Sequence, residues 1–194
     1  MSPGQNGGRR GKLIVISAPS GSGKTTIARE IVRLNPLLKF SVSATTRTRR
    51  EGERDGVDYF FLTKEDFFGR VAAGEFVEWE ELFGNYYGTL KSELETAMSE
   101  NRHILFDVDV KGGLSIQNAF PDALMIFIRT PGMEVLRERL ARRGTETGET
   151  LAKRLERVPM ELAKGSGFQH QVINDDLEQA VTEVQNIVRA FLNS

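Results

Sequence analysis

The stretch APSGSGKTT, residues 18–26, constrains the fold of this chain more than any other feature of the sequence. It follows the short apolar run KLIVIS (12–17) and leads into the amphipathic pattern KTTIAREIVRLN (24–35). A glycine-rich turn that ends in Gly-Lys-Thr, between a buried strand and a helix, is typical of a phosphate-binding loop. The stretch therefore predicts a strand–loop–helix unit of an α/β protein, with an anion site where the helix begins.

The loop departs at one position from the pattern G-x-x-x-x-G-K-[ST], because Ala18 stands in place of the first glycine. Since Pro19 follows it, Ala18 is expected to be extended, a conformation that alanine tolerates. The Lys24 ammonium would neutralise β- and γ-phosphate oxygens, and the Thr25 hydroxyl would ligate Mg²⁺. A turn that merely caps a helix is the alternative, but it has no use for Lys-Thr. We predict a nucleoside triphosphate site made of Ser20, Gly21, Ser22, Gly23, Lys24, Thr25 and Thr26.

Short apolar runs rich in β-branched residues alternate with amphipathic stretches along much of the chain. HILFDVDV (103–110), ALMIFIR (123–129) and QVIN (171–174) are typical of strands buried on both faces of a parallel sheet. Segments with helical periodicity lie between these apolar runs and after the last of them. The alternation predicts a three-layer α/β core.

Two regions interrupt this alternation. Residues 40–90 contain closely spaced aromatic segments that resemble short strands, with one helix expected at 64–73. We interpret them as a small, mostly β insertion in a core formed by residues 11–39 and 91–194. The irregular stretch RRGTETGET (142–150) lies between two helical patterns and predicts a lid at about 142–155, whereas residues 1–10 resemble a disordered, Gly-rich tail.

Charge and composition exclude several classes of function. The chain has 26 basic and 27 acidic residues, so no overall field would attract it to nucleic acid or to an anionic membrane. It has no cysteine and only two histidines, which excludes disulfides and argues against a zinc site. The apolar run at 13–16 is too short for a signal peptide or a membrane span. The expected location is cytoplasmic, with no nucleic-acid or membrane partner.

A phosphate-binding loop also predicts an acidic residue at the end of a neighbouring strand, where it organises the magnesium shell. The segment ILFDVDV offers Asp107 and Asp109, which strict alternation would place on one side of the expected strand. Such carboxylates are costly to bury without a nearby cation. Asp107 and Thr25 are therefore the predicted magnesium residues, with two solvated strand-end aspartates as the alternative.

Several further stretches resemble the guanylate kinase family, in the same order, over roughly residues 12–192. They are SVSATTRTRREGERDGVDYFF, EFVEWEELFGNYYGT, LFDVDVKGG, RLARRGTETGETLAKRL and VINDDLEQA. The resemblance implies a P-loop kinase core with a parallel sheet, a GMP-binding insertion and a helical lid. It also implies that MgATP donates its γ-phosphoryl group to GMP, and to dGMP, in a reaction that yields ADP and the nucleoside diphosphate.

The resemblance places the GMP phosphate on Arg47 and Arg50, joined by the hydroxyls of Tyr59 and Tyr87. Guanidinium forks suit a phosphate dianion, and tyrosine hydroxyls occupy its remaining lone pairs without adding charge. A solvated basic loop and a nucleic-acid groove are the alternatives for this cluster. The second would require a larger basic stripe than this neutral chain contains.

Glu78 is expected to read the base. One carboxylate can accept both the N1–H and the 2-amino group of guanine, whereas adenine presents a lone pair at that edge. Three other glutamates lie nearby in the sequence, and only the resemblance distinguishes Glu78 from them. By the same resemblance, Ser43 contacts the O6 side of guanine, and Thr89 and Asp109 complete the pocket.

The resemblance assigns Arg143 and Arg154 to the lid, where they contact ATP phosphates and, with Lys24 and Asp107, form the catalytic set. No general base is needed, because the attacking phosphate oxygen is already ionised. Asn174, after the last strand, matches a position near the adenine.

One departure from the family and two alternative functions remain open. Lys111 stands where the family often has glutamine, and it could pair with Asp109 or approach a phosphate. The main alternative function is a catalytically silent guanylate-kinase-like module that binds phosphopeptides, although such modules lose the loop lysine or the lid. The other is a kinase of the same fold that acts on another nucleotide, against which Glu78 argues. The sequence does not indicate an oligomeric state.

Overall fold

A parallel sheet forms the centre of the protein, for which a computed structural model describes residues 11–142 and 148–194. In this part of the chain the sheet has five strands, and its order is β2 (Leu38–Phe40), β7 (His103–Asp107), β1 (Leu13–Ser17), β8 (Leu124–Arg129) and β9 (His170–Ile173). Strand β1 pairs with β7 on one side and β8 on the other, both in parallel. Its central position explains why its side chains are almost all apolar and buried.

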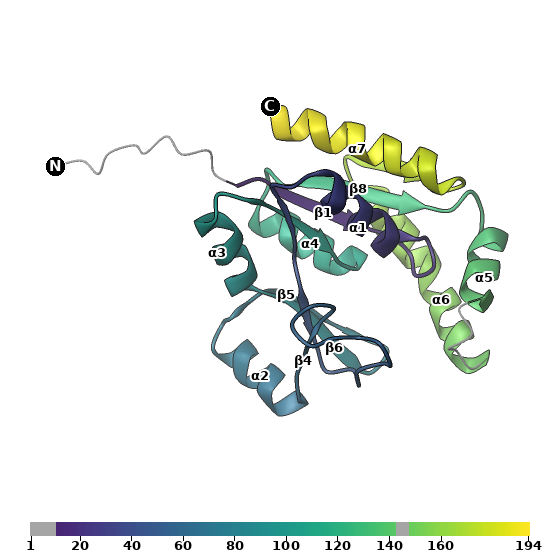
Figure 1. Ribbon diagram of the computed structural model, residues 1–194. Helices are drawn as coiled ribbons and strands as arrows, with labels where there is room; N and C mark the ends of the chain where they lie inside the picture. Colours follow the sequence, from purple (N-terminus) through teal and green to yellow (C-terminus); the bar gives the residue numbers. More distant parts are fainter. Residues whose placement is uncertain (1–10, 143–147) are drawn as a thin grey trace.

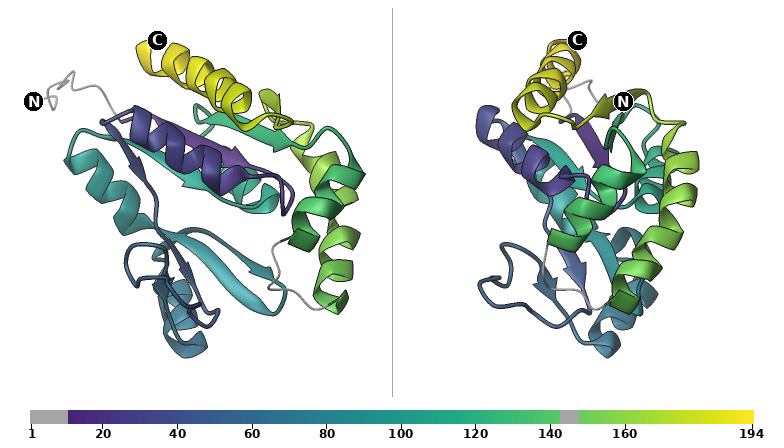
Figure 2. Two further views of the ribbon diagram at one scale, coloured as in Figure 1. Left: turned by 45° about the vertical axis from the view of Figure 1, so that its right-hand side comes forward. Right: turned by 90° about the vertical axis from the view of Figure 1, so that its right-hand side faces the viewer.

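Helices cover both faces of this sheet and make the core three layers deep (Figure 2). Helices α1 (Lys24–Leu34) and α7 (Leu177–Asn193) pack on one face, around buried side chains such as Ile14 and Ile16. The other face is covered by α3 (Lys91–Ser99), α4 (Val110–Ala119) and α6 (Gly148–Gly165). The three-layer α/β core predicted from the alternation of strands and helices is confirmed.

A second, smaller sheet with its own apolar cluster lies below the core in Figure 1. Its strand order in the described residues is β4 (Phe60–Phe61), β3 (Ser43–Thr45), β6 (Asn85–Leu90) and β5 (Phe76–Leu82), and it is accompanied by α2 (Lys64–Ala72). The rings of Phe67 and Phe76 lie 4.6 Å apart in its cluster. Because β2 ends at Phe40 in the larger sheet and β3 begins at Ser43, the chain leaves the core between these two residues.

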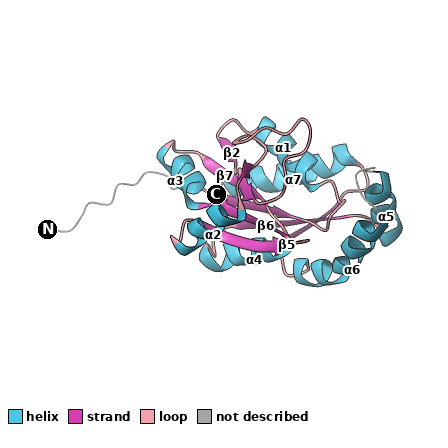
Figure 3. Ribbon diagram, turned by 90° about the horizontal axis from the view of Figure 1, so that it is seen from below, coloured by secondary structure: helices cyan, strands magenta, loops and turns pink. Residues whose placement is uncertain are grey.

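Helices α5 (Met133–Arg142) and α6 form a third unit, at the end of the molecule opposite α3 (Figure 3). They pack through Leu136 and Leu140 of α5 and Val158 of α6, all buried. The predicted lid residue Arg143 lies outside the described residues. Across the described chain, no helix combines the length and the apolar composition needed to cross a lipid bilayer.

Candidate active site

The three units surround a cleft of about 240 Å³ at the carboxyl ends of β1 and β7. Parallel sheets commonly bind ligands at this edge. Most of the residues predicted for the two nucleotide sites line the cleft, namely Ser20, Gly21, Ser22, Gly23, Lys24, Thr25, Ser43, Arg47, Arg50, Tyr59, Glu78, Tyr87, Asp107, Asp109 and Arg154. Residues from the start, the middle and the end of the chain therefore meet at one place.

The glycine-rich loop leaves the amino end of α1 open to an anion. Gly21 and Gly23 have φ angles of 90° and 83°, in the left-handed region that glycine enters without strain. Gly23 is the N-cap of α1, yet no side chain caps the helix and no acidic residue lies in its first turn. The φ angle of Ala18 is not positive, so the loop does not need a glycine at this position. The Ser22 amide donates to the carbonyl oxygen of Pro19 at 3.2 Å. The amides of the first turn of α1 and the positive end of the helix dipole are suited to a phosphate.

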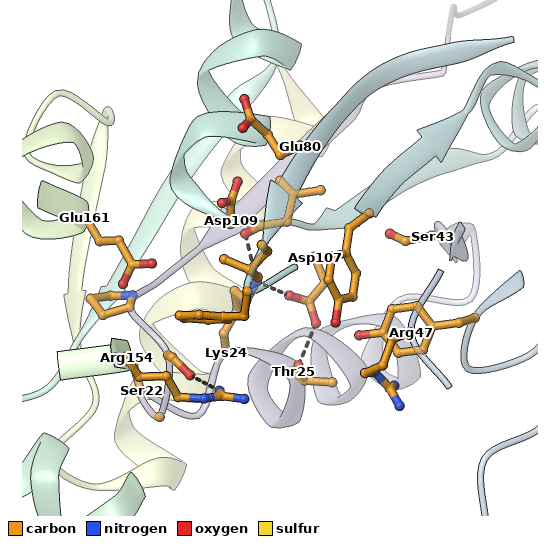
Figure 4. Close-up of a pocket in the computed structure, with 18 of the residues that line it drawn as sticks. Ser22, Lys24, Thr25, Ser43, Arg47, Glu80, Asp107, Asp109, Arg154 and Glu161 are labelled. Atoms are coloured by element: carbon orange, nitrogen blue, oxygen red, sulfur yellow. Dashed lines mark hydrogen bonds and ion pairs between the residues drawn. The ribbon is translucent and has the colours of Figure 1, made fainter. Parts of the chain in front are cut away.

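Lys24 and Thr25 converge on the carboxylate of Asp107 at the end of β7 (Figure 4). The Lys24 Nζ forms an ion pair with Asp107 Oδ1 at 2.6 Å and donates a hydrogen bond to the carbonyl oxygen of Val108 at 2.7 Å. The Thr25 hydroxyl donates to Asp107 Oδ2, also at 2.7 Å. The long lysine side chain is thereby held at the floor of the cleft beside the phosphate loop.

This arrangement fits a magnesium ion. Mg²⁺ prefers hard oxygen ligands and is typically held by only one or two protein groups together with substrate phosphates. Thr25 and Asp107 offer a hydroxyl and a carboxylate oxygen in direct contact. Within the described residues, no group of three or more His, Cys, Asp or Glu side chains forms a complete metal cage. The residues present therefore suit a magnesium ion that binds together with a nucleotide.

Asp109 lies beyond β7, which ends at Asp107 rather than at the predicted residue 110. It is the N-cap of α4, and its Oδ1 accepts a bond of 2.8 Å from the amide of Gly112. The expectation that both aspartates project from one side of a strand is wrong. An aspartate can satisfy a free amide in the first turn of a helix, and this local bond ends the strand early.

Arg47 lies in the loop that precedes β4, where an acidic neighbour holds its guanidinium. Its Nη1 and Nη2 donate to the two carboxylate oxygens of Glu53 at 3.1 and 2.7 Å, and Glu53 also accepts from the amide of Arg50 at 2.7 Å. The hydrogen bond from Arg47 lowers the pKa of Glu53. The guanidinium also lies 5.3 Å from the centre of the Tyr59 ring.

Tyr59 is held as a neutral hydrogen-bond donor. Burial and the negative charge of Asp107 raise the pKa of Tyr59 to about 12. Its ring contacts that of Tyr87 edge-on, with centroids 6.2 Å apart. Two phenol groups and the two arginines of this loop therefore line the same cleft.

Glu78 projects from β5 into the cleft and is only 8% exposed. Its Oε1 accepts a bond of 2.7 Å from the Thr89 hydroxyl on the neighbouring strand β6, in register with Ser43 of β3. Burial, reinforced by the charge of Asp109, raises the pKa of Glu78 to about 7. A carboxylate in this position is poised to accept hydrogen bonds from a ligand that replaces its lost hydration.

Helix α6 contributes Arg154 and Glu161 to the lining of the cleft and places Arg157 against Asp109. The sequence did not indicate Arg157 or Glu161. The Arg154 Nη1 donates to the Ser20 hydroxyl in the phosphate loop at 2.6 Å. Arg157 Nη2 contacts Asp109 Oδ2 at 3.3 Å, and its Nε lies 3.5 Å from Glu161, which lines the cleft. The spacing of three and four residues, which places all three on one face of a helix, is the signal that could have found the last two.

Lys111 does not pair with Asp109, and its approach to a phosphate stays a prediction. Its Nζ lies 3.5 Å from Glu80 Oε2, so it pairs across the boundary between α4 and β5. Glu80 lines the cleft two residues after Glu78, on the same side of the strand.

Asn174, Thr26 and Thr89 do not line the cleft, and Thr89 is connected to it through its bond to Glu78. Asn174 is 4% exposed, and its Nδ2 donates to the carbonyl oxygen of Ser22 at 2.8 Å, beneath the phosphate loop. A Cβ atom at Gly23 would lie 2.5 Å from that nitrogen. Thr26 is exposed on α1. The proposed proximity of Asn174 to the adenine stays a prediction, whereas its contact with the loop backbone is direct.

Replacing Asn174 with alanine should raise the KM for ATP about tenfold, because a buried carbonyl that loses its donor costs about 1–3 kcal/mol. The loss falls on the loop predicted to hold the phosphates, so the KM for GTP and UTP as donors should rise by the same factor. Steady-state kinetics with each donor measures this. A rise for ATP alone would instead make the side chain an adenine contact.

Comparison with known proteins agrees with this geometry. The family model described as guanylate kinase matches residues 10–191. A guanylate kinase of Symbiobacterium thermophilum is 44% identical over 93% of this chain and 86% of its own length. One of Chlorobium luteolum is 48% identical over 96% and 95%. The crystal structure of guanylate kinase from Anaplasma phagocytophilum has a TM-score of 0.75 and 29% identity, over 93% of this chain and 85% of that one.

The match extends through all three units that border the cleft, because the residues it covers include the phosphate loop, the inserted sheet and α6. The resemblance found in the sequence motifs is confirmed over nearly the whole length. This chain belongs to the guanylate kinase family.

Proposed function

We propose that this protein transfers the γ-phosphoryl group of MgATP to GMP, and to dGMP, and that the cleft residues named above carry out the reaction. The observation that carries this proposal is the meeting of a phosphate-binding loop and a buried carboxylate, Glu78, in one cleft. The loop suits a nucleoside triphosphate, and the carboxylate suits the two donors of guanine. ATP-dependent phosphoryl transfer follows from the family, and the assignment of residues is our own.

In the proposed reaction, the loop amides and Lys24 bind the β- and γ-phosphates, and Arg154 reaches them from the lid. Arg47 and Arg50 hold the phosphate of GMP, with Tyr59 and Tyr87 as neutral donors. An ionised oxygen of this phosphate attacks the γ-phosphorus of ATP, and the bond to the β–γ bridging oxygen breaks. No proton is transferred to a protein base. The residues position two anions and neutralise the charge between them.

Thr25 and Asp107 are proposed to hold magnesium, which when bound would neutralise phosphate charge. The Nζ of Lys24 forms an ion pair with Asp107 at 2.6 Å. We infer that Lys24 shifts toward the phosphates when they bind, since their negative charge competes with the carboxylate. Arg143 is proposed as a second lid arginine from the sequence. The cytoplasmic location and the absence of nucleic-acid and membrane partners also stay predictions.

The test is ADP release with MgATP and a panel of GMP, dGMP, AMP, CMP and UMP. Turnover confined to GMP and dGMP is the expected result. Turnover with AMP or a pyrimidine nucleotide would retain the reaction type and refute the role of Glu78. GMP binding without any turnover would favour the silent phosphopeptide-binding module.

The affinity for GMP should fall about tenfold between pH 8 and pH 6, because the pKa of Glu78 is about 7. Below that pKa the side chain is protonated and cannot accept both guanine donors, so a proton competes with GMP. Direct binding titrations without ATP measure the effect. The GMP phosphate has its own second pKa near 6. A Glu78→Gln variant retains that contribution, so the difference between the two profiles isolates Glu78, and identical profiles would contradict the assignment.

A further inference from the structure

Two arginines one turn apart on α6 contact different residues that line the cleft. Arg154 contacts the Ser20 hydroxyl of the phosphate loop at 2.6 Å. Arg157 contacts Asp109, which lines the cleft as Glu78 does, at 3.3 Å. Residues three apart lie on the same face of a helix, so one rigid turn touches both nucleotide sites.

Asp109 connects the second contact to the proposed base pocket. Its Oδ1 accepts from the amide of Gly112, and a Cβ at Gly112 would lie 2.7 Å from Oε2 of Glu78. The carboxylate of Asp109 and that of Glu78 therefore border the same turn of α4. Lys111 is engaged with Glu80 and Lys24 with Asp107, so Arg157 supplies positive charge to Asp109.

Phe83, in the inserted sheet, contacts the same turn of α6. Its ring centre lies 5.3 Å from the guanidinium carbons of both Arg154 and Arg157. Phe83 forms the tip of the β5–β6 hairpin with Gly84, and both have positive φ, 53° and 77°. A turn of this shape favours asparagine or glycine at its first position. Phe83 is an aromatic residue with a strained backbone, which points to a role for its ring in the contact with Arg154 and Arg157.

We propose that Arg157 is a positioning residue through which α6 couples occupation of the ATP site to the affinity of the GMP site. A phosphate that draws Arg154 and the loop together fixes the helical turn that carries Arg157. Through Arg157, the fixed turn of α6 holds the side chain of Asp109. Asp109 in turn holds the first turn of α4 in its position beside Glu78. The inference rests on the proposed function, because the sites that it links are those of ATP and GMP.

The coupling can be measured without turnover. The dissociation constant of GMP is determined by titration calorimetry, alone and with a saturating non-hydrolysable ATP analogue. In the wild-type protein the analogue should tighten GMP binding at least about fivefold, which is the lower end of typical coupling between sites. In Arg157→Ala this factor should fall below about twofold, while the affinity for the analogue alone stays within about twofold of wild type. By reciprocity, GMP should lose the same effect on the analogue.

Two further variants separate coupling from folding. Arg157→Lys keeps the charge and should restore part of the coupling, and Arg157→Met keeps the aliphatic stem if the alanine variant unfolds. Arg137→Ala removes an exposed arginine of the neighbouring helix and should leave the coupling unchanged. Coupling that persists in folded Arg157→Ala or Arg157→Met, or that is absent from the wild type, would overturn the inference.

Failure of the proposed function gives a different pattern. In that case the wild-type protein would not release ADP in the presence of GMP, whatever the state of Arg157. Normal wild-type turnover together with unchanged coupling in the variant would refute the role of Arg157 alone.

Discussion

Replacing Lys24 with alanine should lower kcat by a factor on the order of 1,000 while the affinity for GMP changes by less than about threefold. Removal of one preorganised charge from the reaction centre typically costs about 100- to 1,000-fold in kcat. Here the same ammonium serves the phosphate loop and Asp107, so the loss is expected at the upper end. Apart from Asp109, the residues proposed for GMP belong to the inserted sheet and its loop. In the described structure, the ion pair and hydrogen bond of Lys24 are made to Asp107 and Val108 instead.

Turnover by coupled ADP detection and GMP binding by calorimetry measure the two effects separately. Lys164→Ala, which removes an exposed lysine near the end of α6, is the matched control and should retain wild-type kinetics. An equal loss of turnover and GMP binding in Lys24→Ala would mean that the lysine supports the structure of the whole cleft, and would contradict a role confined to the donor phosphates.

Replacing Glu78 with glutamine should lower the preference for GMP over AMP by about 10- to 100-fold, since an unpaired buried polar group costs about 1–3 kcal/mol. The glutamine amide turns a donor toward a guanine donor, and offers the same donor to the lone pair of adenine. The Thr89 hydroxyl, 2.7 Å from Oε1 in the wild type, can still donate to the amide oxygen. The comparison belongs at pH 8, above the pKa of about 7, where the wild-type carboxylate is ionised.

The ratio of kcat/KM for GMP and AMP measures the preference. Glu81→Gln provides the control, because Glu81 lies on the same strand but is exposed and projects from the opposite side. It should leave the ratio unchanged. A preference for GMP that survives in Glu78→Gln would assign base reading to another residue of the pocket.

The features that could be predicted from the sequence are those written in local patterns. The phosphate loop has a fixed spacing and stands between an apolar strand and an amphipathic helix, so residues 18–26 indicated both the fold and an anion site. The parallel strands are buried on both faces of the sheet, so each appears in the sequence as a continuous apolar run. Aromatic density in residues 40–90 set the inserted sheet apart from the core.

Features that depend on contacts between distant segments could not be predicted in this way. The strand pattern of residues 103–110 did not indicate that Asp109 caps a helix. The pattern is compatible with a longer strand, and it does not show that the Asp109 side chain bonds to the Gly112 amide instead. Lys111 and Glu80 are 31 residues apart, and nothing local pairs them. Arg157 stood in a run of charged residues whose partners became known only when α6 was placed against the cleft.

The bond between Asn174 and Ser22 also bears on how the protein is made. The two residues are 152 positions apart, and the donor follows the last strand of the sheet. A ribosome therefore releases the glycine-rich loop long before it releases the amide that supports the loop from below. Nascent chains and products truncated before β9 have the complete loop sequence but lack its support. The proposed nucleotide site is completed only after Asn174 has been synthesised, so ATP can stabilise chains that contain this support in preference to chains that lack it.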